Sequence, residues 1–272
     1  MIVLQHIKCQ LGNILFQLIT GSYFAKCHSL DYYYESYDTH EIHFNDDYNY
    51  FLNKFKYFKK YKPSIVFNDN NTINLELDFN YDDIPFVENK NYIIRGYCQN
   101  WNFIDYNYAL DILKPSEDIL NKIDKIVPIN IIKNSIGIHL RLKEYIGVYD
   151  RFINDKNRLT KFINDNKDKQ ILIFTDDISY IKNFDKYDNV IIFSEKSNSF
   201  LLDFYALTLC KTLVGGLSTF FIWALYLNLN HPIIYYIKES YDFYNYKFDE
   251  INAPNYIYNN YNFNPSLFKD II

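Results

Sequence analysis

Residues 135–142 read SIGIHLRL, residues 169–175 read KQILIFT and residues 189–194 read NVIIFS. Apolar residues at helical spacing separate these short apolar runs, in RLTKFINDN (158–166) and DDISYIKNF (176–184). The alternation continues with SFLLDFYALTLC (199–210), KTLVGG (211–216), STFFIWALYLN (218–228) and HPIIYYI (231–237). Short strands that alternate with helices are typical of a parallel sheet covered on both faces. The second half of the chain is therefore predicted to be a doubly wound α/β domain.

The first half of the chain shows the same pattern less regularly. An apolar run at 2–4, a glycine-containing turn at 10–13 and apolar residues at helical spacing over 14–27 predict strand, turn and helix. The other predicted elements are strands at 30–34 and 91–97, a helix at 117–126 after a Pro-Ser start, and an amphipathic piece near 50–61. We expect two Rossmann-like α/β domains, 1–130 and 131–272, that face each other across a cleft. In such folds ligands bind at the carboxyl ends of the strands.

Composition excludes several classes of protein. The chain has 272 residues, of which 49% are hydrophobic and 22% charged, so it is neither a disordered polymer nor collagen-like. Its net charge of −5 offers no broad basic face, and we expect no nucleic-acid partner. The 28 Tyr and 23 Phe, with abundant Asn, Ile and Lys, fit A/T-rich codon usage in a low-GC bacterium or a large DNA virus. The aromatic count alone therefore does not indicate sugar stacking.

The cysteines and histidines predict no metal site. The four cysteines are scattered, without a C-x-x-C pair: Cys9, Cys27, Cys98 and Cys210. We interpret them as buried thiols in a reducing compartment. His40 and His43 lie in a polar, loop-like segment that is a poor metal site. The N-terminus lacks the pattern of a signal peptide, and no apolar run approaches the roughly 18 residues of a membrane span. We expect a soluble, cytoplasmic protein without a membrane span.

Candidate chemistry follows the strand at 135–141. An alternating strand places His139 and Arg141 on one face, and Glu144 follows three residues later. An arginine offers phosphate a planar, bidentate donor whose charge persists at any working pH. Taken alone, the pair also fits a packed histidine beside an exposed arginine, so this segment does not decide between the two interpretations.

Two other strand ends carry polar residues. Ser218 and Thr219 follow a Gly-Gly pair and precede an apolar helix, whose free N–H groups and positive dipole end suit an anion. A serine there is also an ordinary helix cap. Asp176 and Asp177 end the strand at 170–175, where carboxylates accept hydrogen bonds either from a ribose or base edge or from a helix N-terminus. These alternatives stay open.

Missing motifs narrow the chemistry. The chain has no Asp-x-Asp, which argues against the acidic metal clamp of many sugar-nucleotide enzymes. It also lacks the phosphate loop of nucleoside triphosphatases, the G-x-G-x-x-G fingerprint of nicotinamide dehydrogenases and the G-x-S-x-G elbow of serine hydrolases. A phosphate-binding α/β protein without a metal motif remains.

Five segments, in order along the chain, resemble those of the family 11 glycosyltransferases, the α1,2-fucosyltransferases. QLGNILFQ at 10–17 is similar to G-L-G-N-Q-M-F-Q, RGYCQ at 95–99 to G-Y-F-Q, and HLRLKE at 139–144 to H-x-R-R-x-D. FTDDI at 174–178 resembles F-S-D-D-I, and residues 203–223 follow the block D-x-Y, C-K and N-S-S-F-S-W-W. The resemblance spans most of the chain.

The resemblance implies a GT-B fold, GDP-fucose as donor, and inverting, metal-independent transfer to a hydroxyl of a glycan acceptor such as the 2-OH of galactose. No cofactor is implied. Carried over residue by residue, Arg141 and His139 hold the GDP diphosphate, Ser218 and Thr219 hold the phosphates, and Asp176 or Asp177 holds the nucleoside. Gly12, Asn13 and Gln17 bind substrate from the other domain, and Glu144 is the candidate general base.

Several positions depart from the family pattern. Leu142 stands for the second Arg, Glu144 for Asp, Gln10 for Gly, Leu217 for Asn and Ile222 for Trp. The loss of a cation that contacts a diphosphate weakens binding by about 1–3 kcal/mol. Two alternatives therefore stay open: a glycosyltransferase that uses another sugar nucleotide, and a catalytically silent glycan- or nucleotide-binding protein of the same fold.

Overall fold

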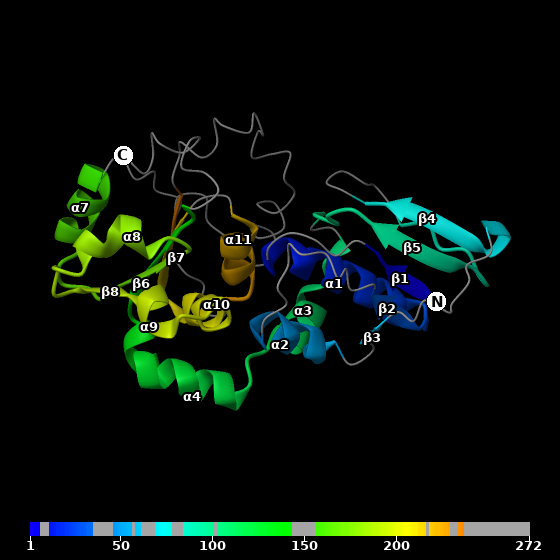
Figure 1. Ribbon diagram of the computed structural model, residues 1–272, viewed down its shortest axis with the longest axis horizontal. Helices are drawn as coiled ribbons and strands as arrows, with labels where there is room; N and C mark the ends of the chain where they lie inside the picture. The colour runs from blue at the N-terminus through cyan, green and yellow to red at the C-terminus, as the bar shows by residue number, and fades with distance from the viewer. Residues whose placement is uncertain are drawn as a thin grey trace. The chain divides into compact units, whose positions relative to one another are not determined.

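The structure is a computed structural model that describes residues 1–5, 11–34, 46–55, 58–60, 69–77, 84–100, 103–142, 156–215, 218–228 and 233–236. The chain divides into two compact units, Met1–Lys114 and Pro115–Ile272. Figure 1 shows that each unit has its own sheet with helices beside it. Within the described part, no helix is long and apolar enough to cross a membrane.

The sheet of the first unit has five parallel strands in the order β3-β2-β1-β5-β4. The strands are β1 (Ile2–Leu4), β2 (Tyr32–Tyr34), β3 (Phe58–Lys60), β4 (Thr72–Glu76) and β5 (Asn91–Arg95). Helix α1 (Leu11–Cys27) packs against β1 and β2, and most of its residues are buried. Gly21 allows this approach, because a Cβ there would lie 2.5 Å from the Tyr32 hydroxyl.

The first unit differs from the sequence prediction at several elements. Helix α1 begins at Leu11, so Gly12 and Asn13 lie in its first turn rather than in a preceding loop. The amphipathic piece predicted near 50–61 is α2 (Asp46–Lys54) followed by β3. Strand β4, the 3-10 helix η1 (Asp69–Asn71) and helix α3 (Tyr106–Leu113) were not predicted. β4 reads TINLE, which alternates polar and apolar residues as a strand does, but it is short, only partly buried, and lies in a stretch crowded with Asn, Asp and Tyr.

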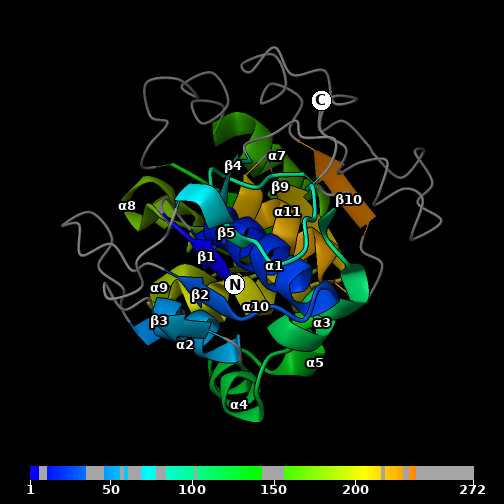
Figure 2. The same ribbon diagram turned by 90° about the vertical axis from the view of Figure 1, so that its right-hand side faces the viewer.

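The sheet of the second unit has five parallel strands in the order β10-β9-β6-β7-β8. The strands are β6 (Ile136–Leu140), β7 (Ile171–Thr175), β8 (Val190–Ile192), β9 (Thr212–Gly215) and β10 (Ile233–Tyr236). In Figure 2, β10 lies beside β9 at one edge of this sheet. The strand order reverses at β6, with β7 and β8 on one side and β9 and β10 on the other. Doubly wound sheets bind ligands at such a switch point, outside the carboxyl ends of the strands.

Helices cover both faces of the second sheet, as predicted. On one face, side chains of β6, β7 and β8 form a core with α7 (Lys156–Asp165), α8 (Ile178–Ile181) and η3 (Lys182–Phe184). The opposite face meets α10 (Phe200–Leu209) and α11 (Thr219–Tyr226). On this face Gly137 lies so close to α10 that a Cβ would be 2.8 Å from Cys210 Sγ and 2.9 Å from Leu207 Cδ1.

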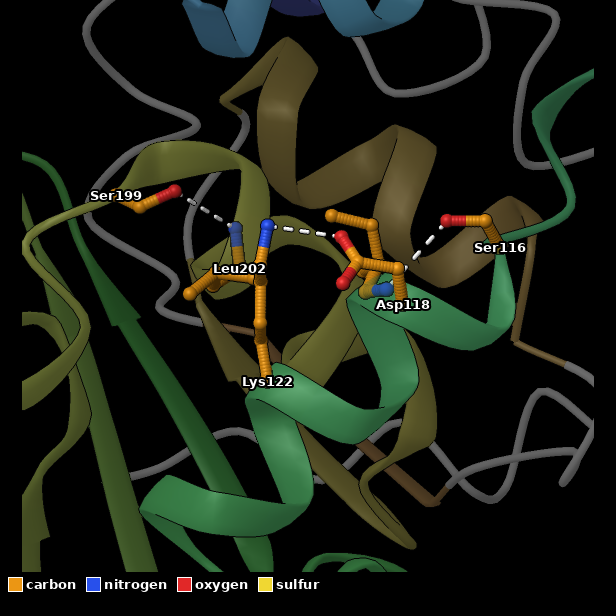
Figure 3. A network of polar contacts seen from close by, with 6 residues as sticks. Ser116, Asp118, Lys122, Ser199 and Leu202 are labelled. Atoms are coloured by element: carbon orange, nitrogen blue, oxygen red, sulfur yellow. Dashed lines mark hydrogen bonds and ion pairs between the residues drawn. The ribbon is translucent and has the colours of Figure 1, made fainter.

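The boundary between the units lies at Lys114/Pro115, earlier than the predicted boundary at 130/131. Helices α4 (Glu117–Ile126) and α5 (Ile129–Ile132) pack against α10, and α4 also packs against α9 (Phe193–Ser197). Figure 3 shows the starts of α4 and α10, where Ser116 accepts a hydrogen bond from Ile119 N and Ser199 accepts one from Leu202 N. The packing of α4 against α9 and α10 joins the helix at 117–126 to the second unit.

Candidate functional site

The side chains of β6 alternate between the two faces of the second sheet. Leu140 and Leu142 are buried in the core that α7 and α8 cover. Gly137 and His139 face α10 and α11. Arg141 directly follows β6, is half-buried, and lies close enough for its charge to lower the pKa of His139. The two residues are thus neighbours at the end of β6, and that their side chains share one face stays a prediction from alternation. Leu142 points the other way and replaces no cation on this face.

His139 is a packed, neutral histidine. Only 9% of it is exposed, and its ring stacks on Phe220 and Phe221, with centroids 5.2 and 6.0 Å away. Burial, followed by the charge of Arg141, lowers the pKa of His139 to about 3. The imidazole therefore adds no positive charge to the site at neutral pH. It instead holds the start of α11 against the carboxyl end of β6.

The N-terminus of α11 lies beside the same strand end. Ser218 is in the N-cap position, but its hydroxyl makes no capping hydrogen bond and its buried Oγ has no hydrogen-bond partner in the described part of the chain. Gly215 lets the helix approach β9, because a Cβ there would lie 2.7 Å from Phe221 Cδ2. The first-turn N–H groups at Thr219 and beyond give this helix end a partial positive charge. Gly216 and Leu217 lie outside the described residues.

Both aspartates after β7 have partners within the protein. Asp176 Oδ1 accepts a hydrogen bond from Leu142 N at 2.6 Å, which ties the end of β7 to the end of β6. Asp177 is the N-cap of α8, and its Oδ1 accepts from Ser179 N at 3.0 Å. The helix-cap interpretation therefore holds for Asp177. Each aspartate is still partly exposed at the carboxyl edge of the sheet.

These features suit the second unit for an anion. His139 touches the second residue of α11, and Arg141 directly follows β6. A guanidinium and a helix N-terminus at one sheet edge can neutralise a diphosphate together. Glu144, the candidate base, lies outside the described residues, as do Gln10, His40 and His43. Among the residues that the structure describes, no group of three or more His, Cys, Asp or Glu side chains could hold a metal ion.

The predicted residues of the first unit lie at the N-terminal end of α1. Asn13 Oδ1 accepts a hydrogen bond from Gln99 Nε2 at 2.7 Å, which links the start of α1 to the loop after β5. Gln17 is fully buried and donates from Nε2 to Gly96 O at 2.8 Å. Gly96 has φ 93°, which favours glycine, and Gln17 braces that turn. Gly12 is buried in the first turn of α1.

No role was predicted from the sequence for two residues that lie near the candidate site in the second unit, Ser194 and Asp203. Ser194 Oγ accepts from Thr175 N at 2.9 Å and donates to the buried carboxylate of Asp203. The signal was available, since Asp203 is the one acid in the apolar helix 199–210. The cysteine interpretation holds for Cys98 and Cys210, which are buried, but is wrong for Cys27, which is exposed. Cys9 lies outside the described residues.

A family comparison identifies the chain. The sequence model of glycosyl transferase family 11 matches residues 78–260. The chain belongs to this family. The match contains the segments around Arg141, Asp176 and Ser218, so this family 11 glycosyltransferase carries its candidate site inside the matched region. A comparison with curated protein sequences finds no match.

Solved structures share the fold of this family 11 member at low identity. The NodZ alpha-1,6-fucosyltransferase soaked with GDP-fucose is 15% identical with a TM-score of 0.50, over 85% of this chain and 96% of the other. Se-Met fucosyltransferase NodZ from Bradyrhizobium is 15% identical with a TM-score of 0.51, over 86% of this chain and 93% of the other. Together with the two parallel sheets, this similarity confirms the predicted α/β, GT-B-like fold class.

Proposed function

We propose that this family 11 glycosyltransferase transfers fucose from GDP-fucose to the 2-hydroxyl of a galactose in a glycan acceptor, with inversion at the anomeric carbon and without a metal ion. Family membership supports the class of reaction. A structural neighbour, NodZ, is described as an alpha-1,6-fucosyltransferase soaked with GDP-fucose, which supports the donor. The galactose linkage comes from the sequence resemblance to the α1,2-fucosyltransferases.

The proposed mechanism uses charge that develops on the leaving group. An acceptor hydroxyl attacks the anomeric carbon from the face opposite GDP, through an oxocarbenium-like transition state. The bond to the diphosphate breaks as the new bond forms, and negative charge grows on the β-phosphate. Groups that bind this charge more strongly in the transition state than in the ground state accelerate the reaction. Arg141 and the N-terminus of α11 supply those groups in the proposal.

One observation carries the proposal: Arg141 directly follows β6, and its charge acts on His139, whose ring stacks against the start of α11. This edge is the switch point of the second sheet, between β6 and β9. His139, being neutral, contributes packing and at most an N–H donor. Asp176 and Asp177 lie at the end of β7, and one or the other is the proposed contact of the nucleoside.

The remaining roles are proposals that rest on the sequence resemblance. Glu144 is the proposed general base, since a carboxylate near the acceptor hydroxyl would remove its proton. The first unit is the proposed acceptor side, with Gly12, Asn13 and Gln17 near its substrate. Because Gln17 is buried and braces Gly96, its proposed contribution is to shape this loop.

The test is a transfer reaction with product analysis. The protein is incubated with GDP-fucose and galactose-terminated acceptors, with and without a chelator, and the products are analysed by mass and by NMR of the new linkage. We expect one added deoxyhexose, α-linked to O2 of galactose, at the same rate with chelator. A product linked elsewhere would correct the linkage alone. The proposal would be contradicted if the protein released no GDP from GDP-fucose, or if it transferred a sugar only from another sugar nucleotide.

A further inference from the structure

The first turn of α10 contains a buried carboxyl group that is linked by hydrogen bonds to the end of β7. Asp203 is in the first turn of α10 and only 7% exposed, although the rest of that helix is almost entirely apolar. Its Oδ2 accepts a hydrogen bond from Ser194 Oγ, and its Oδ1 accepts one from Ser197 Oγ at 2.5 Å. A buried polar group is costly unless hydrogen bonds satisfy it, and here two serine hydroxyls satisfy the carboxyl group.

Ser194 connects Asp203 to the end of β7 through a second hydrogen bond. A serine hydroxyl has one proton and two lone pairs. Because Ser194 gives its proton to Asp203, its Oγ is fixed as the acceptor for Thr175 N, at 2.9 Å. Thr175 Oγ1 in turn accepts from Asp177 N at 3.1 Å. The backbone that carries Asp176 is therefore held on both sides, by Thr175 and by Asp177.

Asp176 carries the interaction across to β6. Its Oδ1 accepts from Leu142 N at 2.6 Å. That N–H belongs to the planar peptide unit that joins Leu142 to Arg141, so the hydrogen bond fixes the plane of the backbone from which the Arg141 side chain leaves. Leu142 is also anchored in the core by its side chain.

We propose that Asp203 is a positioning residue, which aims Arg141 at the donor diphosphate through Ser194, Thr175 and Asp176. The identity of the anion rests on the proposed function. Coupled hydrogen bonds polarise one another in a medium of low dielectric, so the loss of the buried carboxylate is felt along the series. The neutral amide of Asn can offer its N–H₂ group to Ser194, where it competes with Thr175 N for the same oxygen.

The experiment compares Asp203→Asn and Ser194→Ala with a matched control, Ser199→Ala. Ser199 caps the same helix, and Figure 3 shows its hydrogen bond to Leu202 N, but it lies outside the series. Three quantities are measured for each variant: amide hydrogen exchange at Leu142 and Thr175 by NMR, the Kd for GDP by calorimetry, and KM and kcat with GDP-fucose.

We expect both test variants to exchange the Leu142 amide about tenfold faster than the wild type, and to raise the Kd for GDP about tenfold, the factor that corresponds to 1.4 kcal/mol. Ser199→Ala lowers the thermal midpoint but leaves Leu142 exchange and GDP binding unchanged. Ser194→Ala keeps the test valid if Asp203→Asn fails to fold.

The outcomes separate this inference from the proposed function. If the wild type neither binds GDP nor transfers fucose, the proposed function fails, and the exchange at Leu142 still decides whether Asp203 is coupled to Arg141. Unchanged Leu142 exchange in both variants overturns the inference. So does faster exchange with wild-type affinity for GDP, or an equal effect of Ser199→Ala.

Discussion

Arg141→Ala removes the side-chain cation that we propose acts together with the N-terminus of α11. Arg141 follows β6 at the sheet edge, and the strand is anchored there by Leu140 and Leu142 on the opposite face. The fold should therefore survive the substitution. Removal of a single donor from a developing oxyanion typically costs about 10²–10³ in kcat, or about 3–4 kcal/mol. We expect a loss of this size in kcat, together with weaker GDP binding.

The assay is initial-rate release of GDP from GDP-fucose with a saturating acceptor, after thermal unfolding has shown an intact fold. Arg141→Lys keeps the charge and loses the planar fork, so it should fall between the wild type and Arg141→Ala. Lys182→Ala is the control, since Lys182 is an exposed cation of the same unit, 3.5 Å from Glu195. Turnover of Arg141→Ala within about threefold of the wild type, less than the loss of one useful hydrogen bond, would refute the assignment.

Three further substitutions probe the same edge. The folded state holds the pKa of His139 at about 3, so between pH 6.5 and 5 only the unfolded chain takes up this proton. The wild type should then lose up to about 1.4 kcal/mol of unfolding free energy per pH unit, and His139→Gln less; equal losses in urea unfolding would contradict this. Leu142→Arg, which restores the family's second arginine, would bury a charge in the core and lower the unfolding free energy by about 3 kcal/mol or more. Tighter GDP binding at unchanged stability would show that the interpretation of Leu142 is wrong. Gly215→Ala forces Phe221 to move and should cost about 1–3 kcal/mol in thermal unfolding, whereas an unchanged midpoint would mean that α11 does not pack as closely as described.

Sequence periodicity predicted the second unit almost completely. Strands β6 and β7 are buried on both faces, so each is a short apolar run. The helix at 117–126 has a Ser cap and acids in its first turn. The edge strand β4 was not predicted because its five alternating residues lie in a segment crowded with Asn, Asp and Tyr, where so short a pattern does not stand out. The domain boundary was placed too late for a different reason: the packing of α4 on α9 and α10 joins residues about 80 apart in the chain, which local pattern does not report.

The site shows where residue type misleads. His139 remains a predicted contact of the diphosphate, but burial and the nearby charge of Arg141 lower its pKa, so any contact would come from a neutral ring that also stacks on α11. Asp177 is a helix cap, as its alternative interpretation allowed. Leu142 looked like a lost cation in the linear motif, yet its side chain lies in the core, on the opposite face from His139. The sheet face on which a side chain lies, and how deeply it is buried, decide these roles, and a linear sequence motif reports neither.

The most direct test of the central claim is a crystal structure of the protein with GDP bound. We expect the β-phosphate to lie within hydrogen-bond distance, about 3 Å, of both the Arg141 guanidinium and the backbone N–H groups at Ser218 and Thr219. A diphosphate bound elsewhere, or an Arg141 side chain turned away from it, would contradict the account.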